Sequence, residues 1–297
     1  MFLGFIIIKL LSLLGTEEYG IYALVLTLSN LFGLAYLSPI NQTFNRYFYE
    51  YKDKQEYSSF QNYVLLLMFW GIIFVLLAVA GAIICRNLIG YSVLMIILFG
   101  IFIILFKLDE FSISLLNIIR QRKKNSILIN AERGIVILIF FTLQYYFAMN
   151  LLHVLIVFNS VFFIFIVARV FVFNNYTGKT NHALPYSSKI KKELRKKIFA
   201  YLSPFIIWGI AGWLQLNGEK WIIANILSTA DVGIYAVMLS LVNVLITIPS
   251  NYLADFLMPV IFLVSLFLLN PAAEAATVPT VLTLTHASGD AVQVTVK

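Results

Sequence analysis

The sequence predicts an all-α polytopic membrane protein that contains a first six-helix lobe and the first two helices of a second, repeat-related lobe. Three observations support this fold class. Of the 297 residues, 61% are hydrophobic and only 12% are charged, whereas soluble domains carry about 25% charged residues. Apolar runs of the length that crosses a bilayer fill most of the chain. One motif occurs twice, as "LLGTEEYGIYALVLTLSNLF" (13–32) and as "ILSTADVGIYAVMLSLVNVL" (226–245).

The apolar runs predict eight membrane spans. The first is short, because fourteen residues of helix rise about 21 Å, against roughly 30 Å for the hydrocarbon core of a bilayer. We therefore expect the beginning of the chain to be incomplete. The predicted spans are 2–15, 19–40, 61–85, 88–108, 127–148, 150–173, 199–227 and 231–256.

The distribution of lysine and arginine predicts the orientation. Loops that follow even-numbered spans hold 17 of the 21 basic residues, and cytoplasmic loops are the ones enriched in such residues. The N-terminus is therefore expected on the cytoplasmic side. The net charge of +7 is attributed to the basic cytoplasmic loops rather than to a nucleic-acid-binding face. The 17 are Arg46, Lys52, Lys54, Lys107, Arg120, Arg122, Lys123, Lys124, Arg133, Arg169, Lys179, Lys189, Lys191, Lys192, Arg195, Lys196 and Lys197.

Composition divides the chain into four segments. Residues 1–173 form the predicted first lobe, and 174–198, with "KIKKELRKK", form a basic cytoplasmic linker. Residues 199–262 form a partial second lobe. Within the first lobe, the cytoplasmic stretch 109–134 is expected to be either an interfacial helix against anionic lipid or a stop-transfer charge cluster.

The tail, 263–297, departs from the membrane pattern. Its residues are small, polar and alternating, and they predict strands at Thr280–Thr285 and Ala291–Val296 around a Ser-Gly-Asp turn. We expect this tail to be foreign to the fold, as in a truncated, frameshifted or chimaeric gene, rather than the end of a short homologue.

The repeated motif predicts an internal duplication. Its second copy begins 213 positions after the first, beyond the basic linker, and parallel repeats of this kind occur in transporters. Gly20 and Gly233 are predicted to lie in a tight turn, where glycine relieves backbone strain. Tyr22 and Tyr235 are predicted at interfacial depth. Together these four residues are expected to form a hinge-like corner between spans one and two and between spans seven and eight.

Two further stretches, "LSPINQTFNRYFYE" and "YLSPFIIWGIAGWLQLNGEKW", complete a resemblance over roughly residues 1–262. With both motif copies, they resemble the polysaccharide exporters, or oligosaccharide flippases, of the superfamily that also holds multidrug exporters and the lipid II flippase. The resemblance implies a protein of the bacterial or archaeal cytoplasmic membrane that moves undecaprenyl-diphosphate-linked oligosaccharide for O-antigen, capsule or exopolysaccharide synthesis. It also implies membrane lipids, a polysaccharide polymerase and chain-length machinery as partners. The chain lacks the remaining spans of a second lobe, so it is expected to be a truncated member.

Ionisable groups within spans or at their ends, with the amide of Asn41 one turn from Arg46, are the candidate substrate-binding residues, because charge is costly inside the membrane. The resemblance implies a cationic cavity between lobes, where such groups would hold a lipid diphosphate because paired cations offset the cost of desolvating phosphate. The candidates are Lys9, Asn41, Arg46, Glu219 and Lys220. Each also has a structural interpretation: Lys9 as a snorkelling cation, Arg46 as a positive-inside anchor, and Glu219 with Lys220 as a polar corner near the membrane surface.

Other chemistry is not indicated. Cys85 is the single cysteine and the three histidines are far apart, so neither a disulfide nor a metal site is expected. No P-loop or GxSxG motif occurs, so no cofactor is expected. A membrane glycosyltransferase would need sizeable extracytoplasmic loops, which are predicted to be short, so the chain is expected not to be an enzyme.

Two alternatives to the flippase remain. A cation-coupled multidrug exporter of the same superfamily would carry buried carboxylates in its first lobe. Asp109, Glu110 and Glu132 are all predicted at span ends, which disfavours that function. The other alternative is a non-functional truncated remnant, in which alternating access would need a second chain.

Overall fold

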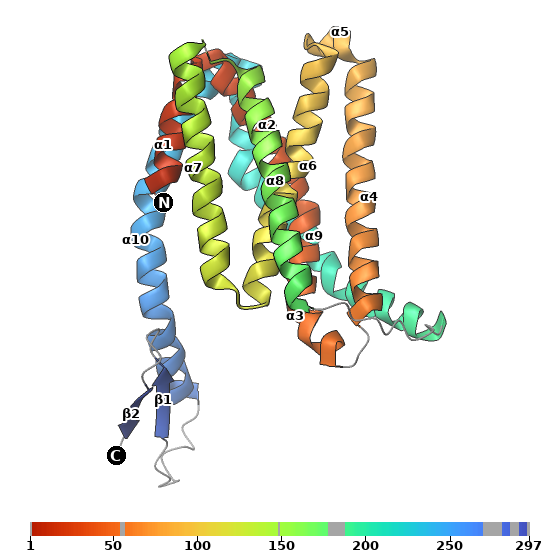
Figure 1. Ribbon diagram of the computed structural model, residues 1–297, viewed down its shortest axis with the longest axis vertical. Helices are drawn as coiled ribbons and strands as arrows, with labels where there is room; N and C mark the ends of the chain where they lie inside the picture. The colour runs from red at the N-terminus through yellow and green to blue at the C-terminus, as the bar shows by residue number, and fades with distance from the viewer. Residues whose placement is uncertain are drawn as a thin grey trace. The chain divides into compact units, whose positions relative to one another are not determined.

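The computed structural model describes residues 2–53, 57–147, 149–177, 188–269, 281–285 and 291–295. These residues divide into two compact units, 1–241 and 242–297. The elements of the first unit follow one another along the chain in Figure 1. They are α1 (Phe2–Leu11), the 3-10 turn η1 (Ser12–Leu14), α2 (Thr16–Phe32), the π-helical η2 (Gly33–Leu37), α3 (Ser38–Asp53), α4 (Tyr57–Ile84), α5 (Arg86–Ile89), α6 (Val93–Ile118), α7 (Arg122–Tyr146), α8 (Leu151–Thr177), α9 (Ser188–Ile226) and the first turns of α10 (Thr229–Leu269).

Each of the eight predicted spans coincides with a helix, as expected of a chain whose backbone groups must be satisfied within the bilayer. Five described helical segments are long and apolar enough to cross a membrane. The fold is thus that of an all-α polytopic membrane protein, as predicted. The five are Thr16–Asp53, Tyr57–Ile84, Arg122–Tyr146, Leu151–Thr177 and Arg195–Ile226.

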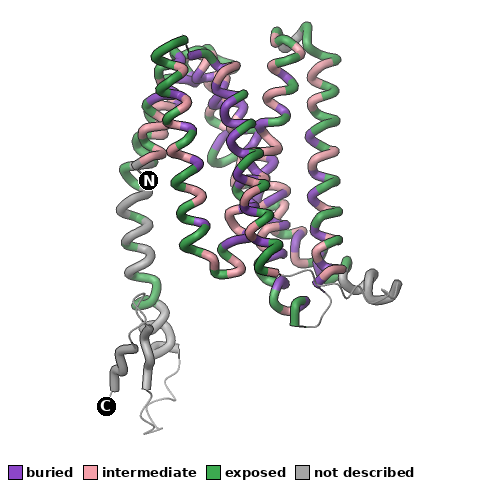
Figure 2. Tube along the Cα trace, in the orientation of Figure 1, coloured by how far each residue is buried: buried purple, intermediate pink, exposed green. Residues whose placement is uncertain are grey.

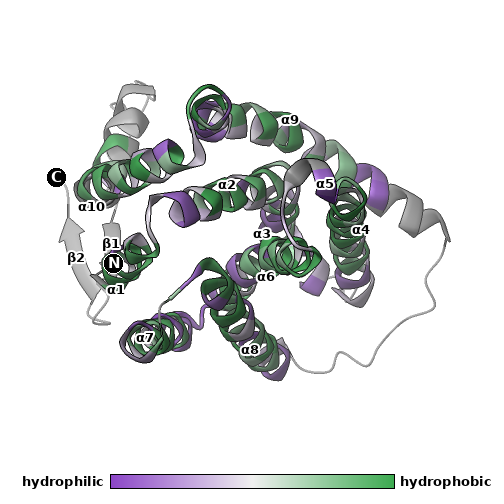
Figure 3. Ribbon diagram, turned by 90° about the horizontal axis from the view of Figure 1, so that it is seen from above, coloured by the Kyte–Doolittle hydropathy of each residue, from purple (hydrophilic) through white to green (hydrophobic). Residues whose placement is uncertain are grey.

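Burial shows which helices form the interior of the first unit. Buried residues are frequent along α2, α6 and α8 and less frequent along α4 and α7 (Figure 2). The exposed faces are apolar rather than polar: Phe74 on α4 is 70% exposed, and the end-on view shows hydrophobic colour around α4, α6 and α8 (Figure 3). Apolar side chains on the outside of a bundle are suited to contact with lipid.

The second span is longer than predicted. Helix continues from α2 through η2 into α3 and ends at Asp53, although the sequence predicted a loop after residue 40. The helix continues past residue 40 because this segment, although rich in polar residues, buries one apolar face against the core. That face consists of Ile40, Phe44, Tyr47, Phe48 and Tyr51.

Of the two alternatives predicted for 109–134, a separate interfacial helix does not form, and the stop-transfer charge cluster stays a prediction. These residues instead complete α6 and begin α7, joined by a tight turn. Arg120 takes a positive φ of 59° in this turn, and the Gln121 N–H donates to the Leu116 carbonyl at 3.0 Å. The apolar residues at the end of α6 face the core: Leu115 and Leu116 are both buried.

Contacts place many of the basic helix ends at one end of the first unit. Lys197 at the start of α9 pairs with Glu50 near the end of α3 at 2.8 Å. Lys124 at the start of α7 donates to the Tyr176 hydroxyl near the end of α8 at 3.0 Å. Lys107 and Arg169 are exceptions to this location. The sequence placed both among the cytoplasmic loops, but they lie buried within α6 and α8.

The second unit contains the continuation of α10 and a two-stranded hairpin. Strand β1 (Val281–Thr285) pairs antiparallel with β2 (Ala291–Thr295), so both predicted strands are confirmed. The predicted turn between them lies outside the described residues, as does part of the predicted linker, 178–187.

Candidate functional site

The five predicted substrate-binding residues are not brought together. Arg46 is exposed on α3, and its guanidinium carbon lies 5.1 Å from the ring centroid of Tyr201, near the start of α9. Lys220 lies nineteen residues further along α9, which corresponds to about 28 Å of helical rise. Lys9 is exposed on α1. A single cavity lined by all of them is therefore not formed within the described residues.

Asn41, on the same helix as Arg46, is half-buried. Its Oδ1 is buried and has no hydrogen-bond partner among the described residues. The role of Asn41 in binding stays a prediction.

Glu219 and Lys220 contact different neighbours, as their adjacency on a helix predicts. The Lys220 Nζ lies 3.4 Å from the Oδ1 of Asn217, one turn earlier on α9. The Glu219 carboxylate faces the Tyr235 hydroxyl of α10 and interacts with it electrostatically. Glu219 therefore links α9 to the second copy of the repeated motif.

The two copies of the motif pack against each other through their glycines. A Cβ at Gly20 on α2 would clash with the backbone carbonyl of Thr229, and a Cβ at Gly233 on α10 would clash with that of Thr16. Each Cβ would also lie 3.0 Å from the backbone nitrogen of the other glycine. Thr16 and Thr229 are equivalent in the repeat, as are Gly20 and Gly233. The contact is thus reciprocal, as between parallel repeats related by a two-fold axis.

This contact corrects the prediction that Gly20 and Gly233 occupy a tight turn. Both are helical, and the turn glycine is instead Gly15, with φ of 91°. Glycine is needed at 20 and 233 because the backbones of α2 and α10 approach closely. Tyr22 is fully packed in the core and Tyr235 is half-buried, so the hinge role of the four residues stays a prediction.

Helix α9 is anchored to α2 by two tryptophans. The Trp213 Nε1 donates to the Thr27 carbonyl at 2.6 Å, and the Trp221 Nε1 donates to the Thr27 hydroxyl at 2.8 Å. An indole N–H that faces apolar surroundings needs such an acceptor.

Replacing Thr27 with Val is expected to destabilise the protein by about 1–2 kcal/mol, because the shape is kept while the Trp221 N–H loses its acceptor. The loss would be measured as a lower thermal midpoint in detergent, followed by tryptophan fluorescence. Thr142→Val is the matched control, since in the part of the chain that the structure describes the Thr142 hydroxyl donates to the Leu138 carbonyl of its own helix α7 and to no other helix. Equal midpoints for the two variants would contradict the anchoring role.

A buried lysine lies where α6 meets α2. Lys107 is 6% exposed, and its Nζ contacts the Asn30 Oδ1 at 3.0 Å and a Glu110 carboxylate oxygen at 2.9 Å. Its aliphatic chain lies against Gly33, the first residue of the π-helical η2. π-helical turns within α-helices are frequent at functional sites.

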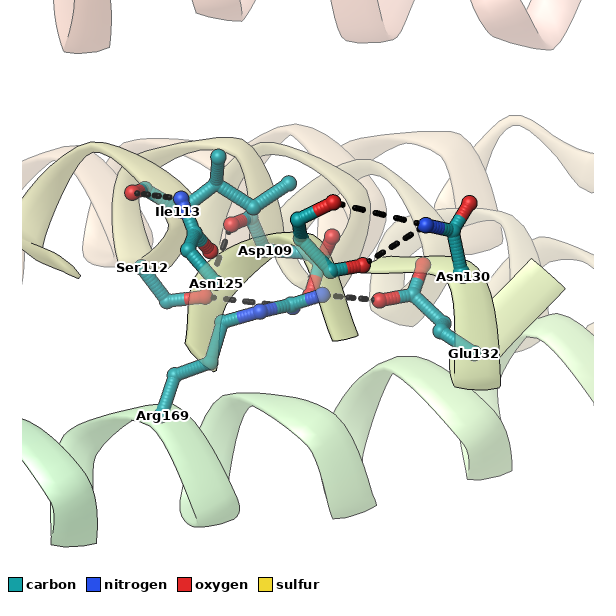
Figure 4. A network of polar contacts seen from close by, with 8 residues as sticks. Asp109, Ser112, Ile113, Asn125, Asn130, Glu132 and Arg169 are labelled. Atoms are coloured by element: carbon teal, nitrogen blue, oxygen red, sulfur yellow. Dashed lines mark hydrogen bonds and ion pairs between the residues drawn. The ribbon is translucent and has the colours of Figure 1, made fainter. Parts of the chain in front are cut away.

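The most buried charged group is a triad of Arg169, Asp109 and Glu132. Arg169 of α8 is 0% exposed, Asp109 of α6 is 4% exposed and Glu132 of α7 is 8% exposed. The guanidinium pairs with both carboxylates, through Nη1 with Asp109 and through Nη2 with Glu132 (Figure 4). Ser112 completes the contacts: its hydroxyl lies 3.4 Å from Nη1 and donates to the Asp109 carbonyl at 2.7 Å.

The sequence missed this triad and assigned its members to span ends or loops. Their pairing depends on three helices that are distant along the chain, and no spacing rule reveals it. One signal was present: Arg169 stands in "FFIFIVARVFVF", an apolar run in which a cation is costly. The burial of Asp109 and Glu132 also corrects the expectation that the first lobe lacks buried carboxylates.

The long apolar helices, with buried charges between them and two motif copies packed against each other, define a polytopic membrane protein. More particularly, the chain belongs to the family described as polysaccharide biosynthesis protein, whose model matches residues 1–265. This match agrees with the extent of the resemblance seen in the sequence. Comparisons with curated proteins and with solved structures gave no match.

Proposed function

We propose that the chain acts as a flippase that moves a lipid-diphosphate-linked oligosaccharide across the cytoplasmic membrane of a bacterium or archaeon, with its N-terminus in the cytoplasm. The observation that carries the proposal is the reciprocal packing of the two motif copies. Transporters that alternate access work through repeat-related parts that move against each other. Membership in the polysaccharide biosynthesis family supports a glycan as cargo.

An apolar cavity supports a lipid-linked cargo. It is an open pocket with a volume of about 550 Å³, lined by residues of α2, η2, α4, α6 and α9, and almost no polar atoms line it. An isoprenoid chain is purely apolar and is stabilised by such surroundings. Residues in its lining include Phe32, Tyr36, Trp70, Phe74, Ile103 and Ile206.

Cations at the ends of α3 and α9 support a diphosphate headgroup. Arg46 lies over the Tyr201 ring, and the Lys197 Nζ lies 4.7 Å from the ring centroid of Tyr47. Guanidinium and ammonium groups bind phosphate oxygens through charge-assisted hydrogen bonds. We assign this basic end as the place where the headgroup first contacts the protein, and membrane lipids as its surroundings. A polysaccharide polymerase and chain-length machinery would take over the product.

Replacing Arg46 with Ala is expected to lower glycan export roughly tenfold to a hundredfold, because one charge-assisted contact of about 1.5–3 kcal/mol is removed. The measurement is surface polysaccharide per amount of protein in the membrane, in the source organism carrying only the variant gene. Lys52→Ala is the control, since Lys52 is an exposed cation on the same helix.

Two results would count against these assignments. Full export by the Arg46 variant removes this residue from the mechanism. Normal surface polysaccharide after deletion of the whole gene, without lipid-linked units accumulating on the inner leaflet, rejects the flippase itself.

A cation-coupled multidrug exporter is the second candidate, and buried Asp109 and Glu132 favour it. Such exporters need carboxylates that are shielded from bulk solvent. If deletion leaves polysaccharide unchanged and increases sensitivity to cationic drugs, this function replaces the flippase.

A further inference from the structure

The triad of Arg169, Asp109 and Glu132 contains more negative than positive charge. One guanidinium faces two carboxylates, and all three side chains are at least nine-tenths buried. With both acids ionised the triad would carry a net charge of −1.

Other charged groups nearby do not supply the missing positive charge. On α6, Lys107 is already paired with Glu110. On α7, Arg133 follows Glu132 but is half-buried, and no ion pair joins it to the triad among the described residues. The charged residues of α2, Glu17 and Glu18, lie at the opposite end of that helix, where Glu18 accepts from the Leu151 N–H that begins α8. Helix α4 contains no charged residue.

A net buried charge between apolar helices is costly, and a carboxylate in that position takes up a proton instead. The geometry favours a proton over a metal ion. Among the described residues, no three His, Cys, Asp or Glu side chains converge as a metal site would require. The guanidinium, moreover, already lies between the two carboxylates (Figure 4).

Two buried polar atoms beside the triad have a free hydrogen-bonding position. The Asn125 Oδ1 has no partner in the described part of the chain, and Asn125 is 3% exposed. Its Nδ2 donates to the Ile113 carbonyl at 3.0 Å, so its amide is held next to Ser112. The Arg169 Nε is likewise buried without a partner in that part. Such groups bind water in protein interiors, and water can carry a proton to and from a buried acid.

We propose that Asp109 and Glu132 share one exchangeable proton, so that the triad is a proton-binding site inside the first lobe. On release, the carboxyl O–H bond breaks, a water molecule accepts the proton, and both carboxylates are then held by Arg169. Release adds an attraction between the newly ionised carboxylate and Arg169 of α8, and a repulsion between the carboxylates of α6 and α7, so proton occupancy is coupled to helix packing. The idea that this proton is the coupling ion of transport rests on the proposed transport function. The binding of a proton by the triad does not depend on that function.

The test is a pH titration of the purified full chain in lipid nanodiscs, followed by infrared difference spectroscopy of protonated carboxyl groups. The wild type should show one protonated-carboxyl band that disappears as the pH rises. Asp109→Asn and Glu132→Gln should each abolish it, because the remaining acid and Arg169 form a neutral pair. Glu110→Gln should keep it, since Glu110 lies on the same helix but pairs with Lys107.

Three results would overturn the proposal. The first is the absence of the band in the wild type at every pH at which the chain stays folded. The second is its persistence in both Asp109→Asn and Glu132→Gln. The third is a thermal midpoint that rises with sodium at constant pH in the wild type and not in these two variants, which would assign a metal cation. None of these readouts depends on glycan transport, so failure of the flippase function is measured separately by export.

Discussion

Replacing Arg169 with Met is expected to cause the largest loss of stability of any single substitution considered, roughly 3–5 kcal/mol. The change leaves Asp109 and Glu132 buried without their counter-charge, while methionine keeps most of the side-chain volume. The measurement is the free energy of unfolding in mixed detergent micelles, compared with the wild type. Arg133→Met is the matched control, because Arg133 lies beside Glu132 on α7 but is only half-buried.

The same experiment separates a charge effect from a packing effect. A triple variant, Asp109→Asn with Glu132→Gln and Arg169→Met, removes all three charges and should recover most of the lost stability. If the single variant loses no more than about 1 kcal/mol, the ion pairs are worth only as much as an ordinary hydrogen bond between membrane helices. That result would contradict the importance we give to the triad.

Replacing Gly20 with Ala is expected to force α2 and α10 apart, at a cost of about 1–3 kcal/mol. The new methyl group would meet the carbonyl of Thr229, and a backbone atom cannot rotate away as a side chain can. The expected result is a lower thermal midpoint together with reduced glycan export. Gly233→Ala should behave in the same way, because the contact is reciprocal.

Two comparisons make this prediction specific. Gly81→Ala, also helical but with nothing within 4 Å of its Cβ position, should be neutral or slightly stabilising. The double variant Gly20→Ala with Gly233→Ala should cost less than the sum of the two, since the first separation makes room for the second methyl. A Gly20 variant as stable as the Gly81 variant would show that the two helices do not meet here.

Apolar periodicity and length predicted the fold class because a bilayer restricts a spanning chain to helices or closed barrels. The eight apolar runs therefore became eight helices. Element ends were less predictable. The segment after residue 40 is polar enough to suggest a loop, yet Phe44 and Phe48 bury one face of a continuing helix. The stretch 109–134 contains both apolar and basic residues, and only packing shows that it belongs to two spans.

The candidate site was predicted less well than the fold. Sequence reasoning chose ionisable residues within spans, such as Lys9 and Lys220, but the structure leaves them far apart or exposed. It missed Asp109, Glu132 and Arg169, since their opposite charges meet only after α6, α7 and α8 have packed. A charge near a predicted span end can face lipid headgroups or the core, and hydropathy does not distinguish the two.

Composition and local pattern were enough to predict a helical membrane protein, to indicate which ends of its helices are basic, and to reveal that one motif is duplicated. Those properties are local or compositional, so a linear chain displays them. What the duplicated glycines do, and which charges are buried, became visible once the helices were packed. Both depend on distances between helices that are remote in sequence: Gly20 faces Gly233 only when α2 meets α10, and Arg169 is neutralised only when α8 meets α6 and α7.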